Sequence, residues 1–403
     1  MDFHILDNDY YKFLMQSQIY YHQEVINSTM LPKRVRYKLF NRGNHCFNFT
    51  ADELRNELIS LQNTPTITDK EEAYLRTCSG LDQRYITWLK GQEKPLNKCE
   101  IEVTGEGENL QVLIYGHWLD TILLEVPVMA LISELHNTPF RYDDGSSLKK
   151  ILPMLGSLVN HNRKFMEFGT RRRYSRKNHK EVFNFLECGC LGSLLGTSNV
   201  LLSYLNLHKP LGTIAHEWFL ANFAKCSIPQ VTERSISSWQ CGKQEDNTAY
   251  LTDTFTSDVF FKSLGNNIVN FKTFRQDSGD PIKFVDKLYN HLIDAWYSLN
   301  MTQKDWNIQD YTIVFSDSLN LEKIERIVNY MESRRSVFPV KYIFGIGTSL
   351  TNNIEGVQPL NIVIKPIEFD YVNVAKVSDD PGKVTGDAYL IQFDIEHFLK
   401  KGN

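Results

Sequence analysis

The sequence repeats one pattern from about residue 165 to residue 350: a short apolar run, then a polar cluster, and usually a stretch with helical periodicity. This is the pattern of successive βα units, in which a buried strand is followed by a helix that covers the sheet. Such units close most naturally into an irregular, TIM-like α/β barrel. Helical stretches lie at 181–187, 281–296 and 321–332. The candidate strands end near Thr170, Ser198, Ala215, Asp253, Arg275, Ser316 and Gly345, with a further run at 361–365.

The first 140 or so residues mix helical and strand signals instead. Thr50 and Glu53 form a capping box that predicts the start of a helix, and alternating apolar residues near Tyr37 predict a strand. Apolar runs on either side of a glycine-containing linker at 105–109 predict a hairpin, and 118–137 predicts one buried helix despite its proline. We therefore expect an N-terminal α+β domain at 1–140 and a barrel with the active site at 141–365. The C-terminal segment 366–403 is expected to return to the first domain.

The composition limits the classes of partner. With 42% hydrophobic and 23% charged residues in 403, the chain is typical of a globular protein with a large core. The formal net charge of −4 supplies no global basic field, so no nucleic-acid partner is expected. No apolar run approaches the length of a membrane span, and acidic residues stand where a signal peptide carries basic ones. We expect a cytoplasmic protein with small-molecule substrates and no membrane partner.

Polar clusters stand at the ends of the candidate strands. In α/β barrels the C-terminal ends of the strands and the loops after them build the active site, so these clusters are expected to meet at one mouth. They comprise 167–173, 196–199, 216–218, Asp253, 275–280, 316–318 and 345–349.

Two of these clusters suit a phosphate group. The basic run contains Arg171, Arg172, Arg173 and Arg176. Guanidinium groups bind phosphate oxygens in bidentate geometry, although a solvated basic face is the commoner explanation of such a run. The stretch 345–349 reads Gly-Ile-Gly-Thr-Ser after an apolar run. Its glycines let backbone N–H groups approach a phosphate, or they simply form a turn.

Histidine and carboxylate side chains complete the candidate chemistry. His216 follows an apolar run, and Asp253 ends the next candidate strand. A carboxylate orients an imidazole that acts as a nucleophile or base, although a lone histidine is more often structural. Asp277, Asp280 and Asp317 are candidate Mg²⁺ ligands, acceptors for ribose hydroxyls, or helix caps. The sequence has no Walker-type phosphate loop and no GxGxxG, so neither a Walker ATPase nor a Rossmann dinucleotide enzyme is predicted.

Taken together, these motifs resemble those of the nicotinate phosphoribosyltransferase family, in order, from Leu6 to about Lys383. The most specific are E-F-G-T-R-R-R at 167–173, G-T-S-N-V at 196–200, G-T-I-A-H-E-W at 212–218 and R-Q-D-S-G-D-P at 275–281. The resemblance implies an irregular α/β barrel with an N-terminal α/β domain, in a homodimer with active sites at the interface. It also implies the reaction. Nicotinate and phosphoribosyl pyrophosphate give nicotinate mononucleotide and pyrophosphate for NAD biosynthesis, and ATP hydrolysis is coupled through a phosphohistidine, as in a ligase.

The resemblance implies roles for residues on the pyridine side of the site. Phe168 and Tyr11 are similar to the aromatic residues that sandwich the pyridine ring, the tyrosine coming from the partner subunit. Arg171 and Arg275 resemble residues that contact phosphoribosyl pyrophosphate and the pyridine. Thr170 belongs to the same substrate-binding motif.

Further roles concern the ribose, the phosphates and the histidine. Asp277 and Asp317 match positions near the ribose and magnesium, and Asp277 is the expected Mg²⁺ ligand. His216 matches the phosphorylated histidine, with Asp253 as its orienting carboxylate. The catalytic group implied by the resemblance is His216, Asp253, Arg275 and Asp277. The loop expected to hold the 5′-phosphate comprises Gly345, Gly347 and Thr348.

Ser198 bears on the choice of pyridine. The related nicotinamide enzymes have aspartate at this position, which accepts a hydrogen bond from the substrate's amide. An aspartate would repel the carboxylate of nicotinate, whereas a serine hydroxyl donates to it, so the acid is favoured over the amide. The alternatives are a nicotinamide or quinolinate phosphoribosyltransferase on the same fold, and a catalytically inactive barrel that binds ligands.

Overall fold

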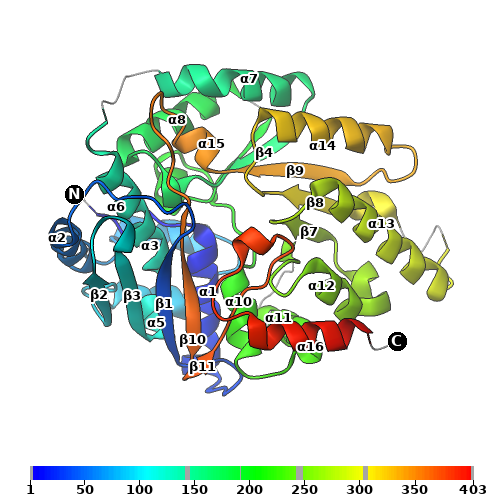
Figure 1. The fold of residues 1–403 in the computed structure, drawn as a ribbon, viewed down its shortest axis with the longest axis horizontal. Coiled ribbons are helices and arrows are strands. Elements are labelled where there is room, and N and C mark those ends of the chain that lie inside the picture. Colours follow the sequence, from blue (N-terminus) through cyan, green and yellow to red (C-terminus); the bar gives the residue numbers. More distant parts are fainter. Residues whose placement is uncertain (1–2, 141–145, 191, 242–247, 303–306, 401–403) are drawn as a thin grey trace.

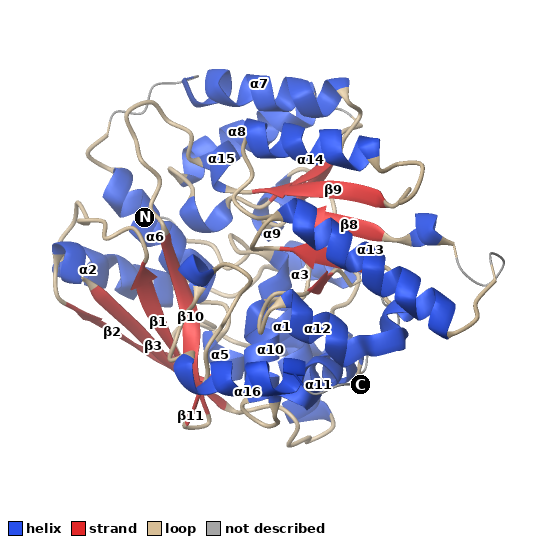
Figure 2. Cartoon of the chain, turned by 45° about the vertical axis from the view of Figure 1, so that its right-hand side comes forward, coloured by secondary structure: helices blue, strands red, loops and turns tan. Residues whose placement is uncertain are grey.

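The structure, a computed structural model, describes residues 3–140, 146–190, 192–241, 248–302 and 307–400. It contains two sheets with helices packed around them (Figure 1). Figure 2 shows their strands as two separate groups, one of which is crossed by long helices on its outer side. Nearly all of the buried apolar side chains belong to one continuous core, so the two parts of the chain pack tightly against each other.

The parallel sheet is the predicted barrel. Its six strands lie in the order β5-β4-β9-β8-β7-β6, and every neighbouring pair is parallel. The strand ends agree with the expected ends near Thr170, Ser198, Asp253, Arg275 and Ser316, and also with that near residue 345. The strands are β4 (Lys164–Glu167), β5 (Leu194–Thr197), β6 (Tyr250–Leu251), β7 (Thr273–Gln276), β8 (Thr312–Phe315) and β9 (Lys341–Ile346).

Helices follow and cover these strands. The predicted helical stretches 181–187, 281–296 and 321–332 lie within α8, α13 and α14. Asp280, one of the candidate metal ligands, is the N-cap of α13 and accepts from the backbone N–H groups of Ile282 and Lys283. The helices are α7 (Ser146–Asn160), α8 (Arg176–Gly189), α9 (Val200–Leu205), α10 (His216–Phe223), α11 (Ile228–Gln240), α12 (Ser257–Leu264), α13 (Pro281–Ser298), α14 (Leu321–Ser333), α15 (Thr348–Thr351) and α16 (Tyr389–Lys400).

The second sheet is antiparallel and has five strands in the order β11-β10-β1-β3-β2. Its strands are β1 (Arg34–Asn41), β2 (Cys99–Thr104), β3 (Gln111–His117), β10 (Ile362–Phe369) and β11 (Val372–Asn373). The predicted hairpin is β2–β3, and the predicted capping box starts α2. The accompanying helices are α1 (Tyr10–Tyr20), α2 (Ala51–Gln62), α3 (Asp69–Thr77), α4 (Gln83–Lys90), α5 (Trp118–Thr121) and α6 (Glu125–Asn137).

Two predicted barrel strands are wrong. The run at 361–365 belongs to β10, which pairs antiparallel with β1, so the expected limit at 365 divides one strand of the antiparallel sheet. Its alternating burial is typical of a strand with one face in the core, unlike a barrel strand buried on both faces. The run that ends at Ala215 forms no strand. Pro210 lacks an N–H to donate, and Gly212 packs closely against Leu14 of α1.

The single helix expected at 118–137 is also wrong. The chain turns at 122–124 and forms two helices, α5 and α6, and Pro127 lies in the first turn of α6, where a missing N–H costs least. The expected domain limit between 140 and 141 adjoins residues 141–145, which lie outside the described residues. None of the described helices has both the length and the apolar character that crossing a membrane requires.

Candidate functional site

Arg275, near the end of β7, is the centre of a hydrogen-bond network at the C-terminal ends of the barrel strands. Its guanidinium donates to Ser316 Oγ at 2.8 Å, to Thr213 Oγ1 at 2.7 Å and to Asp277 Oδ1 at 2.9 Å. Ser316 donates to the same carboxylate oxygen at 2.8 Å. Three clusters that are far apart in the sequence therefore meet in space.

Asp277 also links this network to His216. The imidazole Nε2 lies 3.1 Å from Asp277 Oδ2, and Nδ1 lies 3.1 Å from Thr254 Oγ1. Burial and the nearby ammonium of Lys376 lower the pKa of His216 to about 4, against the pull of the two aspartates. Burial acts to raise the pKa of Asp277, but Arg275 and His216 hold it well below the usual value. At neutral pH the site therefore holds a neutral imidazole beside an ionised carboxylate.

Asp253, the expected orienting carboxylate, contacts Lys376 and accepts a hydrogen bond from Ser278. Its carboxylate lies 3.9 Å from His216 Nε2, too far for a hydrogen bond, but 3.2 Å from Lys376 Nζ. Lys376 Nζ is also 3.0 Å from His216 Nε2. Thr254 and Asp277, rather than Asp253, therefore make the hydrogen bonds that orient the ring, and Lys376 stands between histidine and Asp253.

The sequence reasoning missed Lys376 and also Lys383, seven residues further along the same loop. Lys383 donates to the backbone oxygen of Asp277 at 2.8 Å and contacts the carboxylate of Asp317. Lys323 donates to the backbone oxygen of Asp317 at 2.7 Å. The sequence predicts only that segment 366–403, which contains this loop, returns to the first domain. Two lysines within an otherwise acidic stretch were the one available signal, since nothing local indicates contacts with residues more than 60 positions away.

Phe168 packs directly on the glycines of the loop after β9. A Cβ atom added to Gly345 would lie 2.5 Å from Phe168 Cε2, and one added to Gly347 would lie 3.0 Å from the Phe168 backbone oxygen. The guanidinium of Arg275 stands 5.7 Å from the centre of the Phe168 ring. Gly345 is therefore needed for the close approach of the ring, and Gly347 for the close approach of the Phe168 backbone, whether or not the loop also binds a phosphate.

The basic run divides into two functional halves. Arg173 makes a bidentate ion pair with Asp7 at 2.7 Å for each contact, and Arg176 contacts the same carboxylate. These two arginines hold the N-terminal segment in place. Arg172 is half-buried, and its guanidinium has no carboxylate within ion-pair distance in the described part of the chain. Burial and repulsion from Arg171 and Arg42 lower the pKa of Arg172 to about 10.

Arg42, which the sequence reasoning missed, reaches the same region from the end of β1. It donates to the backbone oxygen of Lys383 at 2.8 Å, and its Nε is buried without a hydrogen-bond partner. Burial lowers its pKa, although Asp380 and Asp277 act in the opposite direction. No local pattern distinguishes this residue from other basic residues at strand ends.

The N-terminal segment supplies the remaining candidates. Tyr11 lies against Arg171 of its own chain, with the guanidinium 5.9 Å from the ring centre. Arg171 stands 3.6 Å from the carboxylate of Asp9, and Ser198 donates its hydroxyl to the same Asp9 at 2.8 Å. Thr170 accepts from the buried Asn199 side chain at 3.3 Å and lies below the surface. The hydroxyl of Ser198, its only side-chain donor, is therefore directed at a carboxyl group of the protein.

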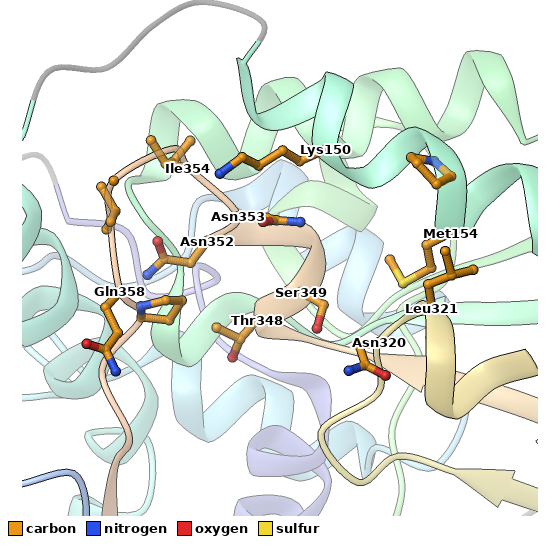
Figure 3. A pocket seen from close by; sticks show the side chains of 14 residues that line it. Lys150, Met154, Asn320, Leu321, Thr348, Ser349, Asn352, Asn353, Ile354 and Gln358 are labelled. Atoms are coloured by element: carbon orange, nitrogen blue, oxygen red, sulfur yellow. The ribbon is translucent and has the colours of Figure 1, made fainter. Parts of the chain in front are cut away.

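Thr348 lines a pocket of about 640 Å³ between α7, α15 and the start of α14 (Figure 3). Asn320, Ser349 and Asn352 contribute polar groups to its wall, and Lys150 reaches toward it from α7. The amide oxygen of Asn352 is buried without a hydrogen-bond partner. The pocket lies beside the loop that the sequence associates with a 5′-phosphate.

Comparisons with known proteins agree with this arrangement. The model of the nicotinate phosphoribosyltransferase (NAPRTase) family matches residues 163–401, and the model of its N-terminal domain matches residues 6–133. The chain belongs to the nicotinate phosphoribosyltransferase family. A nicotinate phosphoribosyltransferase of Chromohalobacter salexigens is 35% identical over 401 residues, which cover 96% of each chain. One of Desulforapulum autotrophicum is 35% identical over 412 residues, covering 98% of this chain and 97% of the other.

Solved structures of this family have the same fold. The nicotinate phosphoribosyltransferase of Porphyromonas gingivalis superposes with a TM-score of 0.83 at 27% identity, covering 98% of this chain and 99% of the other. A putative nicotinate phosphoribosyltransferase of Saccharomyces cerevisiae gives 0.82 at 28% identity, covering 99% and 98%. The α/β barrel with an N-terminal α+β domain is thus confirmed, while the roles of individual side chains stay predictions.

Proposed function

We propose that the protein transfers the phosphoribosyl group of phosphoribosyl pyrophosphate to nicotinate, with ATP hydrolysis coupled through phosphorylated His216. The observation that supports this best is the positive charge at the barrel mouth. Arg42 and Arg172 have no carboxylate within ion-pair distance among the described residues. Lys376 and Lys383 add two ammonium groups. A substrate with a diphosphate and a 5′-phosphate supplies the anions that the two arginines lack.

In the proposed transfer, the nicotinate nitrogen attacks C1 of the ribose. The N–C1 bond forms as the C1–O bond to diphosphate breaks, and diphosphate leaves with the electron pair. Arg275 is held by hydrogen bonds to Ser316, Thr213 and Asp277, so its charge is oriented before substrate arrives. Phe168 packs against the glycine loop after β9, and one face of its ring is expected to stack on the pyridine ring.

A Mg²⁺ ion is expected to accompany the diphosphate. Among the residues that the structure describes, ligand atoms of His216, Asp253 and Asp277 lie within 4.8 Å of one another. The ammonium of Lys376 already lies 3.0 Å from His216 Nε2 and 3.2 Å from the Asp253 carboxylate. Carboxylate oxygens of Asp277 and Asp317 suit Mg²⁺, provided that substrate oxygens supply further ligands. When bound, the ion would stabilise the charge of the leaving diphosphate.

For the coupled step, ATP would phosphorylate His216, with ADP as the leaving group. A water molecule would then hydrolyse the phosphohistidine to phosphate and histidine, which restores the enzyme. The neutral imidazole, whose pKa is lowered to about 4, has the lone pair that this step requires. Lys376, 3.0 Å from Nε2, is placed to stabilise a phosphoryl group on this side chain.

We also propose that the active form is a homodimer, in which Tyr11 of one subunit contributes to the site of the other. Within one chain Tyr11 already packs on Arg171, at the edge of the barrel mouth. Sedimentation equilibrium checks the oligomeric state, and mixing of Tyr11→Ala and His216→Ala subunits tests sharing. If sites are shared, the mixture regains coupled activity that neither variant has alone.

One observation favours nicotinamide as an alternative substrate. The carboxyl group of Asp9 accepts from Ser198, so a carboxyl group lies beside the residue that matches the aspartate of the related nicotinamide enzymes. Burial raises the pKa of Asp9 although Arg171 acts to lower it. In its protonated form Asp9 donates a hydrogen bond, which suits the carboxylate of nicotinate instead. The substrate assay separates the two cases.

The experiment incubates the protein with phosphoribosyl pyrophosphate, Mg²⁺ and either nicotinate or nicotinamide, with and without ATP, while mononucleotide and ADP are measured together. We expect nicotinate mononucleotide with accompanying ADP. In His216→Ala, nicotinate-dependent ADP formation is expected to disappear while weak transfer persists. Product from nicotinamide alone would reverse the substrate assignment, and absence of product from both would favour a barrel that only binds ligands.

A further inference from the structure

His216 is the first residue of a helix that has no side-chain N-cap. Helix α10 starts at His216, and its N-cap residue, Ala215, has no side chain that can accept from the first turn. The preceding residues 209–215 have no regular secondary structure. Neither a strand nor a cap therefore fixes the first turn of α10, so another contact must hold the start of the helix that carries the imidazole.

Glu217, the next residue of α10, makes that contact on a neighbouring face of the helix. Successive residues of a helix point about 100° apart, so Glu217 does not share the direction of His216. The Glu217 carboxylate is 2% exposed and pairs with the ammonium of Lys12 from α1. It also accepts from Tyr37 OH at 2.5 Å and from Trp118 Nε1 at 2.6 Å. Side chains from three elements of the N-terminal part thus hold one carboxylate of the barrel.

Further charged side chains connect the Lys12–Glu217 ion pair to Arg171, on the pyridine side of the site. Lys12, which is fully buried, also contacts Glu125 at 2.6 Å. Glu125 contacts Lys365 at 3.0 Å and lies 3.8 Å from Arg171. Burial alone would lower the pKa of Lys12, but the two glutamates outweigh it and raise that pKa above its usual value. Burial with repulsion from Arg171 and Lys12 lowers the pKa of Lys365 to about 8, against the attraction of Glu125.

We infer that Glu217 is a positioning residue for His216, and that its buried contacts with Lys12, Tyr37 and Trp118 set the imidazole in place for phosphorylation. This inference rests on the proposed function, because it assigns Glu217 to the ATP-coupled half of that reaction. Glu217 touches no reacting group. Its substitution therefore acts through the position of α10 and reduces phosphorylation of His216 more than it reduces pyridine transfer.

The test compares Glu217→Gln, Tyr37→Phe and a matched control, Glu332→Gln. Glu332 on α14 also accepts from a basic side chain, Arg163 at 2.6 Å, and from a tyrosine, Tyr342 at 3.1 Å. These partners lie at the N-terminal ends of β4 and β9, at the opposite end of the strands from the barrel mouth. Radiolabel transfer from γ-labelled ATP to the protein measures phosphorylation, and mononucleotide formation is measured with and without ATP. We expect Glu217→Gln to label at least about ten-fold more slowly, Tyr37→Phe to show a smaller loss, and Glu332→Gln to match the unchanged protein.

The ratio of ATP-stimulated to ATP-independent transfer separates positioning from general damage. A fall in this ratio supports the inference, and an equal loss of both activities overturns it, as does labelling of Glu217→Gln at the original rate. If Glu217→Gln does not fold, Tyr37→Phe retains the ion pair with Lys12 and serves as the test. Labelling of Tyr37→Phe at the original rate then overturns the inference.

An activity-independent measurement separates this inference from the proposed function. With isotope-labelled histidine, NMR follows the nuclear Overhauser contacts between the His216 ring and the Thr254 side chain in the unchanged protein and in Glu217→Gln. These contacts are expected in the unchanged protein, where Nδ1 lies 3.1 Å from Thr254 Oγ1, and are expected to weaken in the variant. Loss of catalytic activity in the unchanged protein would end the proposed function but leave this comparison intact. Unaltered contacts in the variant would end the inference alone.

Discussion

Gly345→Ala is the sharpest test of how the barrel mouth is built. The added Cβ would lie 2.5 Å from Phe168 Cε2, and the backbone at Gly345 is in an ordinary conformation, so the effect is one of space alone. Carbon atoms in contact prefer about 3.5–4.0 Å, so the ring must retreat by about 1 Å. Overpacking of this kind costs about 1–3 kcal/mol of stability. A displacement of about 1 Å at a site reduces reaction rates by about 100-fold.

We therefore expect kcat/KM for nicotinate to fall about 100-fold in Gly345→Ala, because Phe168 no longer offers its face to the pyridine. Steady-state kinetics with varied nicotinate and a thermal melt measure the two effects. Gly156→Ala is the matched control, since a Cβ at this position of α7 has nothing within 4 Å. It is expected to leave kinetics unchanged and to stabilise the helix by about 0.5–1 kcal/mol. Unchanged nicotinate kinetics in Gly345→Ala would refute the packing argument.

Further predictions concern charge at the mouth. Arg172→Met should raise KM for phosphoribosyl pyrophosphate by about 10-fold or more, since a charge-assisted hydrogen bond contributes about 1.5–3 kcal/mol. Its melting temperature should not fall, because the guanidinium has no carboxylate partner; a large loss of stability would contradict this. Asp277→Asn should reduce transfer by about 100-fold or more by releasing Arg275, and near-normal kcat would refute that role. Because the pKa of His216 is lowered to about 4, labelling should stay constant from pH 8 to pH 5 rather than fall near 6.5.

The same shift has a consequence for stability. A histidine whose pKa is about 4 in the folded protein and about 6.5 in the unfolded chain binds more protons when unfolded. The free energy of unfolding should therefore rise with pH between these two values, as far as His216 is concerned. Replacement by alanine should flatten that part of the pH dependence, which chemical denaturation at several pH values measures.

The barrel could be predicted from the sequence because its strands are short, apolar and terminated by polar residues. Local signals also placed the capping box at Thr50 and the β2–β3 hairpin. The two wrong strands share a cause. Local hydrophobicity shows that a segment such as 362–369 is half-buried, but not that its partner is β1, more than 300 residues earlier. The segment 209–215 is apolar because it packs against α1, without forming a ladder.

The candidate site also contains some residues that local sequence motifs indicate and others that only the folded chain brings together. Arg275, Asp277 and Ser316 belong to compact motifs at strand ends, and the structure brings them together. Lys376 and Arg42 come from opposite ends of the chain. The only local signal is that Lys376 and Lys383 stand in an otherwise acidic stretch, and it does not indicate which residues they contact. Ser198 illustrates a different limit. Its hydroxyl was expected to be free for substrate, and only the folded N-terminal segment shows that it donates to Asp9.

The antiparallel sheet packs beside the barrel, and this arrangement brings Lys376 and Arg42, which the sequence did not indicate, to the site. Strand β10 pairs with β1, so the chain after β10 must leave that sheet next to the barrel mouth, and it carries Lys376 there. Arg42 directly follows β1 and enters from the same junction. The barrel itself presents three aspartates with His216, Arg172 and Arg275, while Lys376 and Arg42 add positive charge from outside it. Binding of an anionic substrate should therefore depend on docking of the two parts, and not on the barrel loops alone.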